Sequence, residues 1–194
     1  MGKIFYLMGK SASGKDTVFK ELLKRCPGLK TIVPYTTRPI RAGETDGVEY
    51  HFTDENGLRE MTLGGKVIEC RTYETVMGPW SYFTVDDGQI KKDGKDRYLM
   101  IGTLESYEKM REYFGEELLV PVYLEVPDGE RLLRAVERES RQEHPNYREV
   151  CRRYLADDVD FSEEELGRLG IQKRYRSRSS EQSVEEILKT IALF

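Results

Sequence analysis

The nine residues from Gly9 to Thr17 have the types and the spacing to hold phosphate groups. In order they are Gly9, Lys10, Ser11, Ala12, Ser13, Gly14, Lys15, Asp16 and Thr17. A glycine-rich turn between a strand and a helix directs backbone N–H groups and the positive end of the helix dipole into one concavity. The two glycines leave room for phosphates, and the Lys15 ammonium can reach the terminal ones. We expect this segment, the phosphate loop, to bind a nucleotide, with Lys15 facing solvent when none is bound.

The loop departs in one place from the phosphate-binding pattern G-x-x-x-x-G-K-[S/T]. Asp16 stands where the pattern has a magnesium-binding hydroxyl, and Thr17 follows one position later. Mg²⁺ prefers oxygen ligands and often keeps waters, so a carboxylate can serve there. Because Asp16 also adds negative charge beside the phosphates, its presence makes sense only with a metal bound. We expect Mg²⁺ to enter with the nucleotide, near Asp16 or Thr17. The alternative is a Gly/Ser-rich turn that merely reverses the chain.

Local patterns place this loop in an α/β fold. The apolar run Lys3–Met8 predicts a buried strand, and apolar residues at helical spacing over Val18–Arg25 predict a helix. Two further apolar runs, Arg97–Ile101 and Leu118–Val126, flank a helix-like segment at Glu105–Tyr113. A strand, a helix and a strand at this spacing imply parallel neighbours with a right-handed crossover. The pattern predicts a three-layer P-loop fold around a central parallel sheet.

Two segments interrupt this pattern. Residues 34–85 contain short strand-like runs broken by glycines, which predicts a small β-rich insertion. Residues 127–160 contain two polar helices joined near residues 144–146, with few core-forming residues, and are expected to act as a lid. The core of this single domain, 1–194, would comprise 1–33, 86–126 and 161–194. Near the end of the chain, Ser183 and Glu186 form a capping-box pattern that predicts the start of a C-terminal helix.

Composition limits the partners and the compartment. The 194 residues carry a net charge of −4 and have a pI of about 5.5, so no overall basic field predicts a nucleic-acid partner. No apolar stretch approaches the length of a membrane span, and the N-terminal run is too short for a signal peptide. Cys26, Cys70 and Cys151 lie far apart without metal-ligand spacing, which favours reduced thiols. We expect a cytoplasmic monomer or homodimer that binds neither nucleic acid nor membrane.

A second set of polar residues lies in the insertion. Arg38 and Arg41 are three residues apart and are followed by Tyr50. Guanidinium groups match the oxygens of a dianionic phosphate, and a tyrosine hydroxyl can add a hydrogen bond. An ionised Glu69 only accepts hydrogen bonds, which suits the amino and imino edge of a base. These residues predict a site for a second, phosphorylated substrate. Taken alone, the stretch is also compatible with a solvated charged loop.

The same stretch resembles the guanylate kinase family. T-T-R-x-x-R-x-G-E, then G-x-x-Y-x-F and then I-E match that family's monophosphate-binding insertion, in order and at nearly the same spacing. The resemblance spans most of the chain. It implies that Arg38, Arg41 and Tyr50 hold the phosphate of GMP, and that Glu69 contacts the guanine edge.

In the lid, the resemblance implies that three arginines surround the transferring phosphoryl group, together with Lys15 as the catalytic set. They are Arg134, Arg138 and Arg153. Arg141 and Arg152 are close enough that the assignment can shift to them. From the sequence alone, a charged helix surface is an equally good interpretation of these arginines.

The chain departs from the family at several base-contacting positions. Pro34 replaces a serine, and the family's Y-G-[S/T] turn corresponds roughly to Trp80-Ser81-Tyr82, so Trp80 or Tyr82 would contact the acceptor. The family's D-x-D-x-Q-G strand end corresponds to residues 100–105, where both aspartates are missing. The N-D-D segment beside the adenine is replaced around Ser177-Arg178-Ser179. One charged hydrogen bond contributes about 1.5–3 kcal/mol, so these losses would weaken guanine selectivity without removing the chemistry.

We therefore expect Mg-assisted, in-line phosphoryl transfer from ATP to GMP or dGMP, driven by positioning and charge neutralisation. One alternative is a kinase of the same fold with another small phosphorylated acceptor, which Pro34 and the missing aspartates favour. The other is a catalytically silent guanylate-kinase-like module that binds proteins. The intact Gly14-Lys15 pair and the arginine-rich lid argue against that module, because protein binding requires neither.

Overall fold

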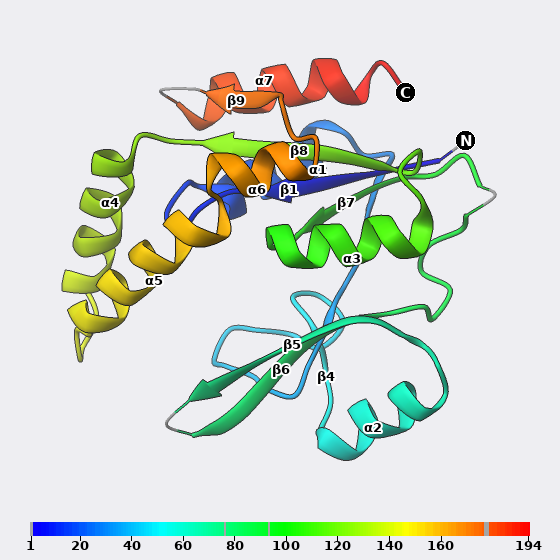
Figure 1. Ribbon diagram of the computed structural model, residues 1–194, viewed down its shortest axis with the longest axis horizontal. Coiled ribbons are helices and arrows are strands. Elements are labelled where there is room, and N and C mark those ends of the chain that lie inside the picture. Colours follow the sequence, from blue (N-terminus) through cyan, green and yellow to red (C-terminus); the bar gives the residue numbers. More distant parts are fainter. Residues whose placement is uncertain (1, 76, 93, 177–178) are drawn as a thin grey trace.

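A parallel five-stranded sheet forms the centre of the computed structural model (Figure 1), which describes residues 2–75, 77–92, 94–176 and 179–194. Across the sheet the strands are β2 (Leu29–Thr31), β7 (Arg97–Ile101), β1 (Lys3–Met8), β8 (Leu119–Glu125) and β9 (Arg174–Arg176). All neighbouring pairs are parallel. The predicted strands β1, β7 and β8 are confirmed. The edge strands β2 and β9 were not predicted, because three residues each carry too little apolar pattern.

Helices cover both faces of this sheet (Figure 1). α1 (Lys15–Arg25) and α7 (Ser180–Ile191) lie on one face, and α3 (Leu104–Phe114) and α6 (Glu163–Arg168) lie on the other. Side chains of β1 point alternately to the two faces. Ile4 and Tyr6 enter the core under α3 and α6, whereas Phe5 and Leu7 enter the core under α1 and α7. A sheet between two helical layers confirms the predicted α/β fold.

A smaller sheet occupies the segment expected to be β-rich. Its strands, in spatial order, are β4 (His51–Phe52), β3 (Tyr35–Thr36), β6 (Gly78–Val85) and β5 (Val67–Thr75). β5 and β6 form a long antiparallel hairpin, which lies apart from the central sheet in Figure 1. The segment also holds a helix that was not predicted, α2 (Glu55–Leu63). It begins after Asp54, whose side chain accepts a hydrogen bond from the Gly57 N–H.

The segment expected to act as a lid is a hairpin of two polar helices. α4 (Asp128–Ser140) and α5 (Tyr147–Asp160) pack against each other and stand out from the rest of the chain in Figure 1. Large apolar side chains on them stay exposed, among them Leu133, Leu155 and Val159. The buried residue of α4 is instead Arg131, which requires a partner because arginine is seldom buried alone. No described helix is long and apolar enough to cross a membrane.

The C-terminal helix begins one turn earlier than predicted. Ser179, not Ser183, is the N-cap of α7, and its side chain accepts a hydrogen bond from the Gln182 N–H. Ser179 and Gln182 form the same S-x-x-E/Q pattern as Ser183 and Glu186, so two starts compete in the sequence. Ser183 and Val184 are buried within the helix, which leaves the earlier serine at its start. The predicted capping box is therefore wrong.

Candidate functional site

The phosphate loop joins the carboxyl end of β1 to the first turn of α1. Gly14 is the N-cap of α1 and has a φ of 87°, a left-handed conformation that favours glycine. Gly9 is required for space, because a Cβ there would lie 2.7 Å from the Leu124 carbonyl oxygen and 2.9 Å from Ser13 Oγ. Ala12 also has a positive φ, 60°, a strained conformation that collects at ligand sites. The segment thus has the strand–turn–helix geometry of an anion-binding loop.

Lys15 does not face solvent, contrary to expectation. Its Nζ donates hydrogen bonds to the carbonyl oxygens of Gly9, at 2.6 Å, and Lys10, at 3.1 Å. Burial lowers the pKa of Lys15. Without a phosphate to bind, the ammonium is satisfied by the loop's own carbonyl groups. The prediction failed because it considered the reach of the side chain but not these nearby acceptors.

Asp16 and Thr17 are exposed in the first turn of α1, where both offer oxygen ligands. The negative charge of Asp16 acts on the neighbouring Lys15 and opposes the lowering of its pKa. Within the described residues, no group of three or more His, Cys, Asp or Glu side chains could hold a metal ion unaided. Mg²⁺ is commonly held by one or two carboxylates together with substrate phosphates, and these residues fit that arrangement.

The other side of the loop contacts α5, through side chains that were not predicted from the sequence. The Ser11 N–H donates to Asp157 Oδ2 at 2.8 Å, and Lys10 Nζ pairs with Asp158 at 2.6 Å. Arg131, only 1% exposed, donates from Nη1 to the Ser11 carbonyl oxygen at 3.1 Å and to Asp157 at 3.2 Å. Its Nη2 pairs with Asp128 of its own helix at 2.6 Å. We call these six residues the loop–hairpin cluster: Lys10, Ser11, Asp128, Arg131, Asp157 and Asp158.

This cluster ties both helices of the hairpin to the loop. Its acidic residues bind the Ser11 N–H and the Lys10 ammonium. Both of these loop groups are otherwise suited to bind phosphate oxygens. A signal for Arg131 was present in the sequence, because residues 131, 134 and 138 share one face of a helix at i, i+3 and i+7. No spacing rule pointed to Asp157, which lies 146 residues from Ser11 along the chain.

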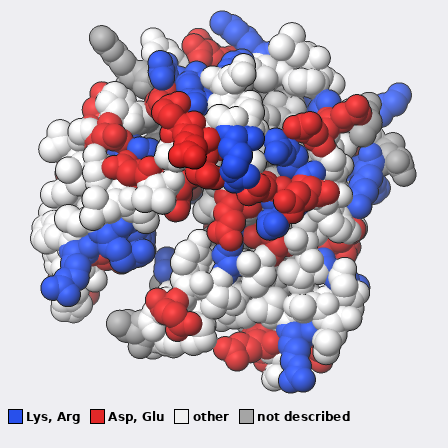
Figure 2. Space-filling view, viewed as in Figure 1, with Lys and Arg blue, Asp and Glu red and all other residues white. Residues whose placement is uncertain are grey.

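The predicted lid arginines lie on the exposed surface of the hairpin. Arg134 and Arg153 each pair with a glutamate one turn earlier on the same helix, at 3.2 and 2.6 Å. Arg138 is close enough to Lys15 for its charge to contribute to the lowered pKa of that lysine. Figure 2 shows Lys and Arg side chains gathered over the outer ends of α4 and α5, with a notch between them and the insertion. The alternatives Arg141 and Arg152 are also paired with glutamates. The role of these arginines stays a prediction.

In the insertion, Arg38 is buried at the centre of the residues predicted to hold the acceptor phosphate. Its guanidinium forms a fork with Glu44, at 2.8 and 3.0 Å, which lowers the pKa of that carboxyl. It also lies 5.6 Å from the ring of Tyr50, which in turn packs 5.7 Å from the ring of Tyr82. Arg38 Nε is buried and has no hydrogen-bond partner among the described residues. The fold therefore brings Arg38, Tyr50 and Tyr82 close together.

The other two predicted acceptor residues of this region lie further out. Arg41 is exposed, and Glu44 accepts a hydrogen bond from its backbone N–H at 2.8 Å. Trp80 pairs across the hairpin with Tyr73, two residues beyond Tyr82 towards the turn. Since successive residues of a strand alternate between faces, Trp80 shares a face with Tyr82 and Thr84. Its contact with an acceptor stays a prediction.

Glu69 lies deep between the insertion and the central sheet. Its carboxylate accepts hydrogen bonds from Arg71 Nε at 2.9 Å and from the Thr84 hydroxyl at 2.7 Å. Arg71 in turn reaches Thr103, the N-cap of α3, at 3.1 Å. These three residues were not predicted from the sequence, although Glu69 and Arg71 stand two apart on one strand and so share a face.

One of the two missing aspartates has a structural explanation, at Gly102. A Cβ at this position would lie 2.1 Å from the Tyr6 hydroxyl oxygen, so Tyr6 excludes any larger residue. The Tyr6 hydroxyl donates to Ser106 at 2.7 Å, and burial, with the nearby charge of Glu69, raises its pKa. Of the segment near the C-terminus that replaces the family's adenine contact, Ser177 and Arg178 lie outside the described residues.

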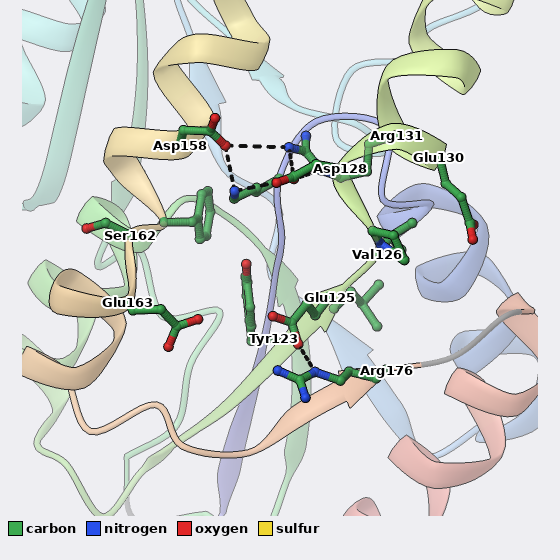
Figure 3. A pocket seen from close by; sticks show the side chains of 14 residues that line it. Tyr123, Glu125, Val126, Asp128, Glu130, Arg131, Asp158, Ser162, Glu163 and Arg176 are labelled. Carbon is green, nitrogen blue, oxygen red and sulfur yellow. Dashed lines mark hydrogen bonds and ion pairs between the residues drawn. The ribbon is translucent and has the colours of Figure 1, made fainter.

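A cavity of about 800 Å³ opens beside Lys10 at the carboxyl ends of β8 and β9 (Figure 3). Asp128, Arg131 and Asp158 of the cluster close one end, and an ion pair between Glu125 and Arg176 lies at the other (Figure 3). Ligands of open α/β sheets bind outside the carboxyl ends of the strands. The cavity therefore lies at the edge of the sheet where ligands of such folds bind, next to the phosphate loop.

Comparison with known proteins gives one consistent family. Residues 1–151 match the family model described as guanylate kinase. Among sequence relatives, the guanylate kinase of Frankia casuarinae is 48% identical over 63 residues, covering 32% of this chain and 34% of the relative. That of Mycobacterium tuberculosis is 42% identical over 69 residues, covering 36% and 33%. The chain thus spans about a third of the length of the relatives it matches.

A solved structure extends the likeness over the whole chain. The crystal structure of guanylate kinase from Anaplasma phagocytophilum superposes with a TM-score of 0.70, covering 99% of this chain and 85% of that one. The two sequences are 20% identical, so this likeness concerns the fold.

Proposed function

This chain belongs to the guanylate kinase family, and from that premise we propose that it transfers the γ-phosphoryl group of ATP to a nucleoside monophosphate, GMP or dGMP. The phosphate loop, residues 9–17, would hold the donor. Arg38, Arg41, Tyr50 and Tyr82 would hold the acceptor phosphate, with Trp80 nearby and Glu69 at the base.

The observation that carries this proposal is the position of two unsatisfied polar atoms. Within the described residues, two buried side-chain nitrogen or oxygen atoms have no hydrogen-bond partner, Ser13 Oγ and Arg38 Nε. One lies in the phosphate loop and the other in the predicted acceptor site. Buried polar groups are nearly always paired, so each exception calls for an explanation. A bound phosphate at each site would supply the missing acceptors.

Catalysis in this proposal is positioning and charge neutralisation. Lys15 would leave the carbonyl groups of Gly9 and Lys10 and bind the terminal phosphates of ATP. Asp16 and Thr17 would hold Mg²⁺, which neutralises phosphate charge when bound. Arg38 and Arg41 would hold the acceptor phosphate in line with the donor.

The hairpin would move during this cycle. The Ser11 N–H, now bonded to Asp157, would be released to phosphate oxygens, and Arg134, Arg138 and Arg153 would close over the transferring group. Closure of this kind excludes water and protects ATP from hydrolysis.

One observation favours the alternative of a kinase with another phosphorylated acceptor. Glu69, the residue expected to read guanine, already forms an ion pair with Arg71 at 2.9 Å. The intact loop and the unsatisfied Ser13 and Arg38 atoms do not favour a silent protein-binding module.

The test is an ADP-release assay with ATP, Mg²⁺ and a panel of GMP, dGMP, AMP, CMP and UMP. Lys15→Ala serves as the inactive control for contaminating kinases. Preferred turnover of GMP or dGMP supports the proposal. Turnover of another monophosphate alone would retain the kinase and reject guanine. No turnover of any of the five would reject the proposed function and favour a different phosphorylated acceptor or the silent module.

We also propose a cytosolic location, which the free Cys26, Cys70 and Cys151 support because reduced thiols persist there. Whether the chain is a monomer or a homodimer stays a prediction, to be checked by light scattering.

A further inference from the structure

The carboxylate of Glu69 is occupied by donors from two sides. Arg71 Nε donates to Oε2 at 2.9 Å, Arg71 Nη2 lies 3.4 Å from Oε1, and the Thr84 hydroxyl donates to Oε1 at 2.7 Å. The Glu69 side chain is 1% exposed and that of Arg71 is 13% exposed. The free side of the guanidinium is fixed by Thr103 at 3.1 Å. This pair is thus a built part of the interior, held by β5, β6 and the start of α3.

Arg71 presents to Glu69 the same kind of donor pair that a guanine would present. The N1–H and the exocyclic amino group of guanine are two nearly parallel N–H donors on one N–C–N unit. The Nε–H and Nη2–H of arginine are the charged form of that fork. Charge-assisted hydrogen bonds are roughly twice as strong as neutral ones, so a neutral guanine competes at a disadvantage for these oxygens.

A second cavity, of about 340 Å³, lies where it can receive the Arg71 guanidinium once that group leaves Glu69. Thr103, which Arg71 already contacts, lies on its wall, and so do Glu105 and Asp160. Neither carboxylate forms a salt bridge with any described residue, and burial raises the pKa of Asp160. An arginine moving past Thr103 would therefore meet two carboxylates that form no salt bridge. The cation on the same wall, Arg168, is already paired with Glu108 and Glu165.

We propose that Arg71 determines the base specificity of the acceptor site by holding the place on Glu69 that a guanine edge would take. Guanine then binds only by displacing Arg71 towards the second cavity. This inference rests on the proposed function, since it takes Glu69 to be the residue that reads the acceptor base. It predicts that Arg71 raises the KM for GMP and has little effect on kcat, because Arg71 competes with GMP binding and not with phosphoryl transfer.

The experiment measures binding of GMP, IMP, AMP and ATP by calorimetry, without turnover, to the wild type and to Arg71→Ala. Removal of the competing fork should lower the Kd for GMP about 10- to 100-fold, and leave those for AMP and ATP unchanged. Arg59→Ala is the matched control, because Arg59 is an exposed arginine of the same insertion and makes no contact with Glu69. Arg71→Lys keeps the charge without the fork and should have an intermediate Kd for GMP.

If Arg71→Ala fails to fold, a second test uses the wild type alone. IMP has the N1–H but lacks the amino group, so it cannot replace the whole fork, and it should bind more weakly than GMP by about tenfold. Equal affinity for IMP and GMP would overturn the inference. An unchanged or raised Kd for GMP in a folded Arg71→Ala would overturn it as well, since Arg71 would then be neutral towards the base or contact it directly.

These outcomes separate the inference from the proposed function. ADP release from GMP with an unaltered Kd in Arg71→Ala rejects the role of Arg71 and retains the kinase. Tighter GMP binding by Arg71→Ala, without ADP release from any monophosphate, supports the role of Arg71 and rejects the proposed transfer to GMP or dGMP.

Discussion

Replacing Arg131 by methionine should destabilise the protein more than any change of an exposed lid arginine. The side chain is 1% exposed and pairs with Asp157, itself 12% exposed, at 3.2 Å. Removing one partner of a buried ion pair leaves an uncompensated charge, which costs about 3–5 kcal/mol. The second pair, with Asp128, adds little, because that carboxylate is 52% exposed and screened by solvent. Methionine keeps an apolar stem but loses the contact of the Arg131 guanidinium with the Tyr154 ring, 4.9 Å from its centroid, so the loss measured is mainly electrostatic.

Arg134→Met on the same helix is the matched control. Arg134 is 45% exposed and pairs with a glutamate that is 47% exposed, at 3.2 Å, so its loss should cost well under about 1 kcal/mol. Urea unfolding followed by circular dichroism gives both values from the midpoint and the slope. For a chain of this size, about 3–5 kcal/mol also corresponds to a fall in Tm of roughly 6–20 °C.

Equal stability of the two variants, to within about 0.5 kcal/mol, would contradict this prediction. That result would mean that Asp157 finds another cation or is hydrated when Arg131 is absent. A stable Arg131→Met protein with a raised ATP affinity would instead show that the loop–hairpin cluster mainly opposes nucleotide binding.

Three further predictions concern the proposed reaction. Lys15→Ala should lower kcat about a hundred- to a thousandfold while the circular dichroism spectrum is unchanged, and near-normal turnover would contradict the assignment of the loop. Arg38→Ala and Arg41→Ala should each raise the KM of the acceptor far more than that of ATP, as initial-rate kinetics can check; equal effects on both substrates would argue against a separate acceptor site. GMP should be preferred over AMP by kcat/KM, but the margin should be smaller by about 1.5–3 kcal/mol than in a relative with both strand-end aspartates; a preference for AMP would reject Glu69 as the reader of guanine.

Elements whose pattern is local could be predicted from the amino-acid sequence. A short apolar run, a glycine-rich turn and a helical apolar stripe follow one another from Lys3 to Arg25, and the structure places them as β1, the loop and α1. Neighbouring residues set the turn geometry, so Gly14 could be identified without knowing what packs around it. The parallel sheet followed as well, because a strand–helix–strand order leaves few topologies. Short elements such as β2, β9 and α6 were missed, and two overlapping cap patterns at the C-terminus could not be ranked without the core.

Which charged side chains pair with one another depends on the packing of distant segments and could not be predicted. Arg131 reaches Ser11 across 120 residues of chain, and Arg71 reaches Thr103 across 32. Residue types show that such groups need partners, but several carboxylates and cations of similar strength are available to each. Which pair forms depends on how the helices and strands pack. A change of a few tenths of an ångström in the donor–acceptor distance decides whether a hydrogen bond forms. The phosphate loop could therefore be recognised from its sequence. The hydrogen-bond partners of its N–H groups and of Glu69 could not.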